Sequence, residues 1–406
     1  MKPCQLIISI IMVACLFTAC SSVESPEHIF STIEENGVPV VLSSGGPKYT
    51  QSLFTYEELY RLEQDESREE TVLSGASSPC MDSAGNVYVG DAQNYRIVVF
   101  DKTGHFLRSM GREGSGPGEF QMISLLGIFN DHVIACDMRQ MRTTIFTTDG
   151  EFIRSIRYPR VTMKQPLFFN TSRAYPAPGN SLVLIQQAFA PVGDVTGSAF
   201  RAGIHTEDGD ELAEVLSPPA PPPDPFIGAP ILHYIPGRGI LHVKCPEPEM
   251  EWYDLDGSLR QVIRLDIQRD PVTAVDRDRI TAEIRAEIDN SPEGNQRNRA
   301  QRELDSLEFP DDRDPWFQAM VDESGFIWAG EPRGSYLSSN HLRKWRLLSP
   351  EGEYLGDTFF PEVPGSTAAG RPSHGHLIMT WNDEETYAPV ITVYRVRSSI
   401  RGFVYP

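Results

Sequence analysis

A short strand–turn–strand motif with a glycine in its turn recurs along the chain and constrains the fold more than any other feature of the sequence. Glycine adopts the positive φ that a tight turn requires, and apolar residues flank each turn, as in β-hairpins. The turn glycines are Gly104, Gly150, Gly209, Gly257 and Gly352. Most of them are roughly 45 to 60 residues apart, a spacing typical of a β-propeller with one four-stranded sheet per blade.

A second, more apolar kind of hairpin alternates with these turns. Its six copies span residues 81–89, 128–136, 175–185, 234–243, 321–329 and 373–381. Six copies predict six blades. The last blade lacks a full outer hairpin, and we expect an N-terminal strand from about Leu53 to Glu63 to complete it, which closes the ring and removes exposed edges.

The stretch from about Val275 to Leu307 departs from the β pattern. It is highly charged, and Ile280, Ile284 and Ile288 follow one another at four-residue spacing, as on the buried side of an amphipathic helix. The fold class predicted is therefore all-β: a six-bladed β-propeller with four-stranded blades and a helical insertion between blades four and five, at about residues 273–309. Such an insertion either builds over a ligand-binding mouth or is a solvated decoration.

The N-terminus has the three parts of a bacterial export signal: Lys2, an apolar run over residues 6–17, and small residues before Cys20. The run is too short to cross a bilayer, and no later stretch is longer and equally apolar, so we expect no transmembrane helix. The order Leu-Phe-Thr-Ala-Cys over residues 16–20 resembles the bacterial lipobox, although Phe17 replaces the usual aliphatic residue. That resemblance implies a lipoprotein signal peptide over residues 1–19 and acyl chains such as palmitate on Cys20.

One alternative to lipidation at Cys20 stays open, an ordinary signal peptide in which this cysteine is incidental. A rival lipidation site at Cys15 lies inside the apolar run and leaves too short a hydrophobic region.

The predicted domain order continues with a lipid-anchored flexible tether over residues 20–50, which are rich in Ser, Glu, Pro and Gly, and the propeller over residues 51–406. Ser21 after the cysteine favours the outer membrane, by analogy with the sorting rule of Gram-negative bacteria, at its periplasmic or surface face. The membrane is then a partner through the lipid anchor. A formal net charge of −20 repels phosphate backbones, so we expect no nucleic-acid partner.

Three cysteines remain in the body of the chain, Cys80, Cys136 and Cys245. At most one disulfide can form among them. Each lies in or beside an apolar, strand-like stretch, which favours three buried thiols, because free cysteine packs as a small hydrophobic residue.

Residues 79–120 closely resemble an NHL repeat. Asp91, Asn94, Arg96 and Ile97 match the repeat's Asp-x-x-Asn-x-Arg-Ile core, and the Gly-Pro-Gly-Glu-Phe sequence of residues 116–120 matches its inter-blade turn. The later copies have diverged. The whole resembles the six-bladed, NHL-repeat-like propeller lipoproteins of bacteria over about residues 55–397, and in NHL repeats Asp91, Asn94 and Arg96 would brace adjacent strands through hydrogen bonds and an ion pair.

Candidate metal ligands are few. His374 and His376 flank a glycine, and alternation on a strand would put both imidazoles on one face. Some NHL-type propellers are lyases or hydrolases that hold Ca²⁺ or Zn²⁺ at the central channel, and His132, His233 and His242 lie on the inner hairpins here, at no fixed register. A calcium or zinc cofactor therefore stays an open possibility.

Catalytic residues are not assigned, because no nucleophile elbow, zinc-protease helix, phosphate-binding loop or dinucleotide fingerprint occurs. We therefore carry two hypotheses. The first is a lipid-anchored binding or scaffold module at the cell envelope, which presents loops and a channel to a protein, peptide or glycan. The second is a metal-dependent lyase or hydrolase with its site at the central channel.

Overall fold

The computed structural model describes residues 27–157, 168–177, 181–189, 199–206, 211–216 and 231–406, except residues 246, 268, 293, 306, 317, 332–343, 364–368 and 384. The expected signal peptide and the expected lipidation site, Cys20, lie outside the described residues. Within the described part of the chain, no helix has both the length and the apolar content that crossing a membrane requires.

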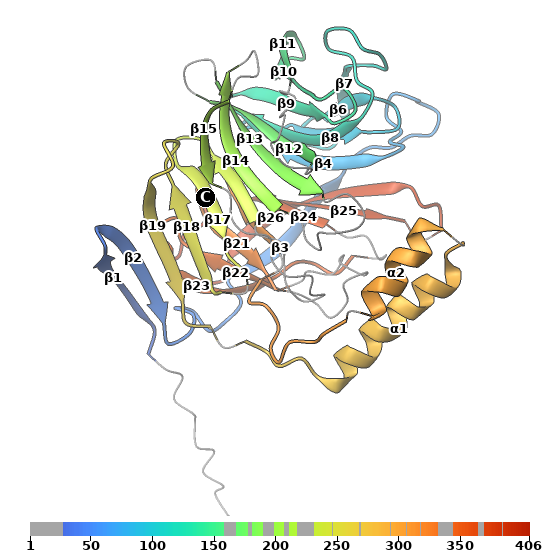
Figure 1. Ribbon diagram of the computed structural model, residues 1–406. Helices are drawn as coiled ribbons and strands as arrows, with labels where there is room; N and C mark the ends of the chain where they lie inside the picture. The colour runs from blue at the N-terminus through green and yellow to red at the C-terminus, as the bar shows by residue number, and fades with distance from the viewer. Residues whose placement is uncertain are drawn as a thin grey trace, which may run out of the picture.

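Six sheets, each built on four antiparallel strands, form a six-bladed β-propeller (Figure 1). The first three blades comprise β4 (Ala76–Met81), β5 (Val87–Asp91), β6 (Arg96–Phe100) and β7 (Phe106–Met110); β8 (Ile123–Phe129), β9 (His132–Asp137), β10 (Arg142–Thr147) and β11 (Phe152–Arg157); and β12 (Phe168–Ala177), β13 (Ser181–Phe189), β14 (Ala199–Thr206) and β15 (Glu211–Leu216). Six blades of four strands confirm the predicted architecture.

The other three blades are built in the same way. They comprise β16 (Ile231–Ile235), β17 (Gly239–Val243), β18 (Glu249–Tyr253) and β19 (Leu259–Leu265); β20 (Gln318–Val321), β21 (Ile327–Gly330), β22 (Lys344–Leu348) and β23 (Tyr354–Phe359); and β24 (Ala369–Ser373), β25 (His376–Asn382), β26 (Pro389–Ser398) and β3 (Phe54–Arg61). The first strands of neighbouring blades lie side by side, as β24 with β4 and β4 with β8. The apolar core lies between adjacent sheets: Trp252 of blade four packs with Trp316 and Ile327 at blade five.

The outer hairpins turn at the glycines that the sequence singled out. Gly104, Gly150, Gly257 and Gly352 have φ between +84° and +98°, a region that glycine enters without the steric cost other residues meet. Each donates its N–H to the carbonyl three residues earlier, at 2.9 to 3.0 Å. The fifth turn glycine, Gly209, lies outside the described residues.

The ring is closed by the N-terminal strand β3, as predicted. It pairs antiparallel with β26 and becomes the outermost strand of the last blade. Phe54, its first residue, is buried against Trp328 and Tyr405, with ring centroids 5.5 and 4.8 Å away. Two ends of the chain therefore hold one blade together.

Residues 29–44 correct the expectation of a flexible tether through residue 50. They form a hairpin of β1 (Ile29–Glu35) and β2 (Val38–Ser44), and β2 pairs in parallel with β19, so that blade four has six strands (Figure 1). The turn is Asn36-Gly37, with φ of 52° and 81°, the positive values of the two-residue turn that best matches strand twist. Val40 and Val41 are buried beside β19, which holds the hairpin in place.

Two helices, α1 (Ala274–Asn290) and α2 (Asn295–Asp305), follow β19 in the chain and precede β20. Thr273 and Asp276 form a capping box at the start of α1, which satisfies backbone N–H groups that a helix end leaves without partners. Ile280, Ile284 and Ile288 are buried against Ala300 of α2 in an apolar cluster made only of residues 272–309. The pair of helices therefore has a small core of its own.

The three cysteines are free: Cys80 and Cys136 are buried and Cys245 is partly buried. Burial raises the pKa of the Cys80 thiol to about 12 and also raises that of Cys245. The prediction of buried thiols agrees with the arrangement of Cys80 and Cys136. Cys80 packs in an apolar cluster between blades one and two, and Cys136 is fully buried on β9.

Candidate functional site

One end of the propeller combines a helical projection with a group of ionisable side chains. Glu249 at the start of β18 pairs with Arg264 at the end of β19, so the β17–β18 connection and the exit toward α1 share the same end of blade four. We call residues 270–313, which include both helices, the helical arm, and this end of the ring the arm end. The turn between β4 and β5 lies at the opposite end, because strand direction alternates within each blade.

The helical arm has a closed neck. Val272 donates to the carbonyl of Asp311 at 2.8 Å and Arg313 to that of Asp270 at 2.8 Å, so the two chain segments that enter and leave the arm are held together. The Asp276 carboxylate accepts from Arg279 at 2.9 Å and from Arg313 at 2.6 Å. Burial works to raise the pKa of Asp276, but its hydrogen bonds from Thr273 and the two arginines lower that pKa far below its usual range.

Alternating residues of β17 and β18, together with Lys244 directly after β17, form what we call the blade-four cluster: His242, Lys244, Glu249, Glu251 and Tyr253. His242 Nδ1 lies 3.0 Å from Glu251 Oε2, which also accepts from the Tyr253 hydroxyl at 2.9 Å. Lys244 bridges the two carboxylates, 2.8 Å from Glu249 and 3.4 Å from Glu251. Opposite charges on cross-strand neighbours stabilise this pairing of strands.

The electrostatics of the cluster fix the charge of its members. Burial by itself would raise the pKa of Glu251, but hydrogen bonds from His242 and Tyr253 and the charge of Lys244 lower it to about 2. Burial and the neighbouring Glu251 raise the pKa of Tyr253, so its hydroxyl stays a donor. Lys244 has a raised pKa: burial opposes its charge, and the two glutamates outweigh that effect.

The cluster and the arm are joined through one indole. Trp316, which is fully buried, follows the neck of the arm and donates its Nε1–H to the carbonyl of Lys244 at 2.7 Å. The Lys244 side chain is 29% exposed, so it can offer an ammonium group to a polar ligand at the arm end. Chemically, the group provides one cation, two fixed carboxylates and an imidazole, which suits polar recognition.

The sequence singled out only His242 of this cluster. The other four residues carry a signal that is visible in retrospect. Charged or polar residues recur with period two at Glu249, Glu251 and Tyr253 of β18, where the alternate residues are apolar, and Lys244 lies two residues after His242. Their convergence depends on cross-strand register, which a short loop between residues 243 and 249 sets.

Asp91, Asn94 and Arg96 brace the first blade. Asp91 accepts from Arg96 Nε at 3.0 Å and from Asn94 Nδ2 at 2.8 Å, and its other oxygen accepts from the Ser74 N–H at 3.0 Å. Arg96 also donates to the carbonyls of Glu69 and Val72. These bonds tie the β5–β6 turn to the segment that enters the blade.

The second blade repeats this arrangement. Asp137 accepts from Gln140 Nε2 at 2.7 Å and from the Gln121 N–H at 2.7 Å, while Arg142 donates to backbone carbonyls at Ser115 and Gly116. Asp137 and Gln140 therefore occupy the roles of Asp91 and Asn94, and Arg142 resembles Arg96 in its bonds to carbonyls of the segment that enters the blade.

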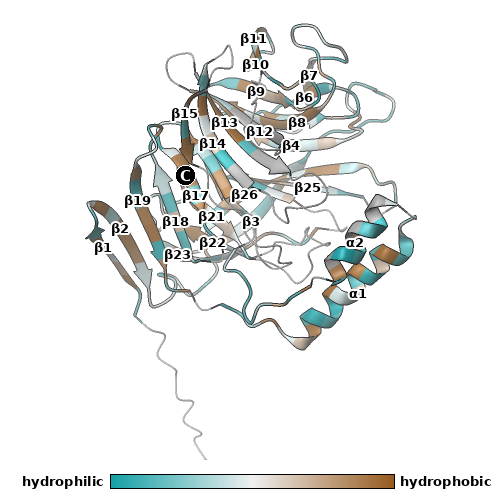
Figure 2. Ribbon diagram, in the orientation of Figure 1, coloured by the Kyte–Doolittle hydropathy of each residue, from teal (hydrophilic) through white to brown (hydrophobic). Residues whose placement is uncertain are grey.

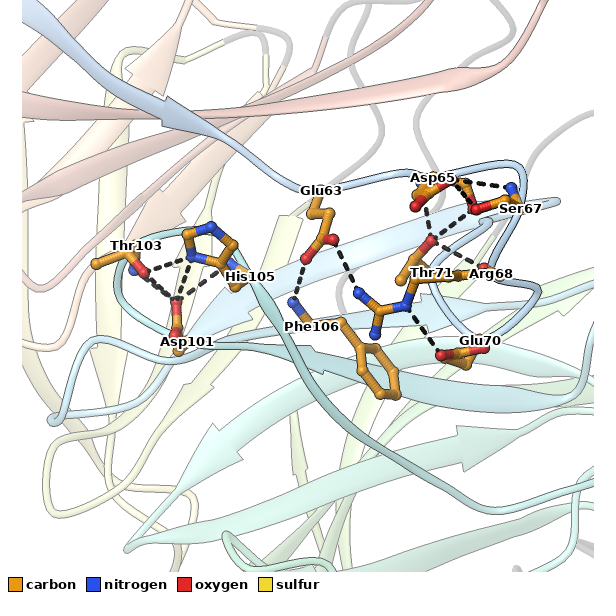
Figure 3. A network of polar contacts seen from close by, with 10 residues as sticks. All are labelled: Glu63, Asp65, Ser67, Arg68, Glu70, Thr71, Asp101, Thr103, His105 and Phe106. Carbon is orange, nitrogen blue, oxygen red and sulfur yellow. Dashed lines mark hydrogen bonds and ion pairs between the residues drawn. The ribbon is translucent and has the colours of Figure 1, made fainter.

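A further network fixes the segment between the closing strand β3 and the first blade (Figure 3). Arg68 donates to Glu63 at 3.0 Å and to Glu70 at 3.1 Å, and Glu63 accepts the N–H of Phe106 at 3.1 Å. The guanidinium also lies 5.9 Å from the Phe106 ring centroid. The side chains in Figure 3 thus tie residues 63–71 to the outer hairpin of blade one, in which Asp101 caps the turn through Thr103 and His105.

The predicted pair His374 and His376 does not share a strand face. His374 is in a turn with φ of 45° and lies 4.0 Å from Glu323, whereas His376 begins β25 and has Nδ1 2.7 Å from the His374 carbonyl. The reason is the tight Ser-His-Gly-His turn, which takes His374 out of the strand alternation.

The remaining histidines are dispersed. His132 Nδ1 contacts the Asn130 carbonyl, and His233 Nε2 contacts the Ala319 carbonyl of the next blade at 2.8 Å. Over the described ranges, no three His, Cys, Asp or Glu side chains are grouped in a way that could hold a metal ion. Sequence reasoning also missed Arg371 on β24, which reaches past blade one and donates to the Leu126 carbonyl of β8 at 3.2 Å.

Comparisons with known proteins agree on the fold. A family model described as a 6-bladed beta-propeller matches residues 66–177. No curated protein matches the sequence. Among solved structures, an exported protein of Bacteroides fragilis has 11% sequence identity and a TM-score of 0.52, with 88% of this chain and 99% of that chain covered.

A second structural relative is a member of the DUF4221 family from Bacteroides vulgatus. It has 14% identity and a TM-score of 0.52, and the alignment covers 85% of this chain and 98% of that one. At such low identities the likeness concerns the fold. Together with the strand order, it identifies the chain as a six-bladed β-propeller.

Proposed function

We propose that this chain is an exported, NHL-like lipoprotein whose propeller acts as a binding or scaffold module at the cell envelope, held to the outer membrane by lipid on Cys20. The N-terminal sequence supports the anchor, since a short apolar run ends in small residues and Cys20. Support for the NHL-like character comes from the Asp-Asn-Arg brace of blade one and the corresponding Asp137–Gln140 bond of blade two.

The observation that carries the binding role is the helical arm. It has its own apolar core, a capped first helix and a closed neck, and it leaves the ring at the same end as the blade-four cluster. A preformed projection beside fixed charges loses little conformational entropy on binding, which is an advantage for a recognition surface. The ligand class is a protein, peptide or glycan with polar groups that pair with Lys244 and the cluster carboxylates.

Site-specific photocrosslinking in intact cells tests the role of the arm end. A photoreactive amino acid replaces Ala286, which is exposed on α1, and in a matched control it replaces Ala84, which is exposed in the β4–β5 turn at the opposite end. We expect an adduct of defined mass from position 286 and at least tenfold less of it from position 84. Equal labelling at both positions, or none at position 286, would contradict a binding surface at the arm end.

A further inference from the structure

The hairpin that precedes the propeller pairs β1 with β2 on one side and leaves the other edge of β1 without a neighbouring strand among the described residues. Strand β1 is the terminal strand of the six-stranded sheet and extends it beyond the rim of blade four (Figure 1). Because the Asn36-Gly37 turn has two residues, Glu35 and Val38 form a hydrogen-bonded pair, and the pairs of Ile33 and Ser31 with β2 follow the same alternation. The backbone N–H and C=O groups of Phe30, Thr32 and Glu34 therefore point to the open edge.

The side chains of this edge are unusually apolar for a solvated strand. Ile29, Phe30 and Ile33 are all exposed, and Figure 2 shows hydrophobic residues along both strands of the hairpin. The first five residues, Ile-Phe-Ser-Thr-Ile, contain no charge and no proline, which are the devices that normally prevent edge-to-edge pairing. Other outer strands do contain them: β7 has Arg108, and β11 has Arg154 and Arg157.

We propose that β1 pairs with β1 of a second copy of this chain, antiparallel about a twofold axis at Thr32, to form a continuous sheet across two propellers. The strand is self-complementary in this register. Glu34 and Glu35 of one copy face Phe30 and Ile29 of the other, so no two carboxylates are directly opposite. Ile33 meets its symmetry mate diagonally, within reach of a side-chain contact.

The position of β1 in the chain favours a second copy as the occupant. Only residues 21–28 separate Cys20 from β1, and that length reaches at most about 28 Å when fully extended. The inference rests on the proposed lipid anchor at this point, because anchoring holds the β1 edges of many copies in one layer and raises their effective concentration. Antiparallel pairing keeps both tethers on a shared membrane surface, since the two strands begin only about 20 Å apart along the sheet.

Cysteine crosslinking of the full-length chain in its native membranes tests the proposal. A T32C chain is oxidised with copper phenanthroline, and Cα atoms of a hydrogen-bonded pair about 5.5 Å apart suit a disulfide. The matched control is T55C, which places the thiol on β3, another exposed outer strand. We expect a reducible dimer of T32C and at least tenfold less dimer of T55C.

A second pair of variants separates pairing from unrelated effects. I33K in the T32C chain places a charge on the edge, and L107K does the same on β7, where Leu107 has a nearly equal exposure of 45% against 43%. We expect I33K to reduce the dimer at least tenfold and L107K to leave it unchanged. The low reactivity of the buried Cys80 and Cys136 keeps them out of the reaction.

Three results would overturn the proposal: no more dimer from T32C than from T55C, an adduct with a protein of different mass, or a monomer whose new thiol is shielded by lipid from an impermeant reagent. Membrane fractionation of the same cells distinguishes a failure of the β1 pairing from a failure of the proposed lipid anchoring. A chain that is in the membrane fraction but does not crosslink refutes the pairing alone, whereas a chain outside that fraction refutes the proposed anchoring.

Discussion

Substitution D276A is expected to loosen the helical arm and leave the propeller folded. The carboxylate closes the capping box with Thr273 and pairs with Arg279 and Arg313 at the neck. Loss of the cap costs about 1 kcal/mol, and loss of the charged hydrogen bonds costs a further ~1–2 kcal/mol, reduced because Arg279 is well exposed. The sum of about 2–3 kcal/mol corresponds to a roughly 30- to 160-fold larger population of the locally open state.

Hydrogen–deuterium exchange of residues 272–309 measures this effect directly. The exposed Asp278, on the same turn of α1, provides the matched D278A control, for which we expect less than a threefold change. The apolar cluster of the arm is separate from the sheets, so amides of β17 and β18 should keep their protection. Unchanged exchange in the arm of D276A, or simultaneous loss of protection in the sheets, would refute the reasoning.

Three further predictions concern the body of the propeller. The pKa of Glu251 is lowered from 4.5 to about 2, so its contribution to stability is present above about pH 4.5 and is lost as the pH falls toward 2. In urea titrations, E251Q should reduce the loss of unfolding free energy over this acidic range by up to about 3 kcal/mol. An unchanged pH dependence would contradict the pairing of Glu251 with His242 and Lys244. The thiols of Cys80, Cys136 and Cys245 should react with a disulfide reagent at least a hundredfold more slowly in the native protein than in urea, because burial opposes thiolate formation at Cys80 and Cys245. Fast labelling of the native protein would contradict their burial. F54A should lower the free energy of unfolding by about 3–5 kcal/mol in chemical denaturation, because it leaves a cavity where the Phe54 ring of β3 is buried. The control F359A, at an exposed position of β23, should lower it by less than about 1 kcal/mol. Equal losses would exclude β3 as the strand that closes the ring.

Much of the fold could be predicted because its signals are local. Turn glycines such as Gly104 and Gly257 have positive φ in the structure, and the isoleucines of α1 are buried as their four-residue spacing indicated. The hairpin of β1 and β2 was missed although Asn36-Gly37 is a strong turn signal. Its neighbours, rich in Ser, Glu and Pro, favoured a tether, and only the pairing of β2 with the distant β19 makes this hairpin part of the sheet.

The candidate site was less predictable because it depends on register between strands. Glu251 contacts His242 and Lys244 only because β17 and β18 pair, and each residue taken alone in the sequence is typical of a solvated polar side chain. His374 shows the opposite error, since spacing suggested a shared face with His376 and a tight turn removed it. The Asp137 brace lies between these cases: its sequence had diverged to Gln140, but the amide group makes the same bond to the carboxylate as Asn94 does.

Metabolic labelling with an alkyne analogue of palmitate tests the central claim, that the propeller is held at the envelope through Cys20. The full-length chain is compared with C20A and with C15A, which changes the other cysteine near the predicted cleavage site. We predict that the wild-type chain and C15A incorporate the label and sediment with membranes, and that C20A loses both properties. Label that persists in C20A, or an unlabelled wild-type chain released from the membrane, would contradict the account.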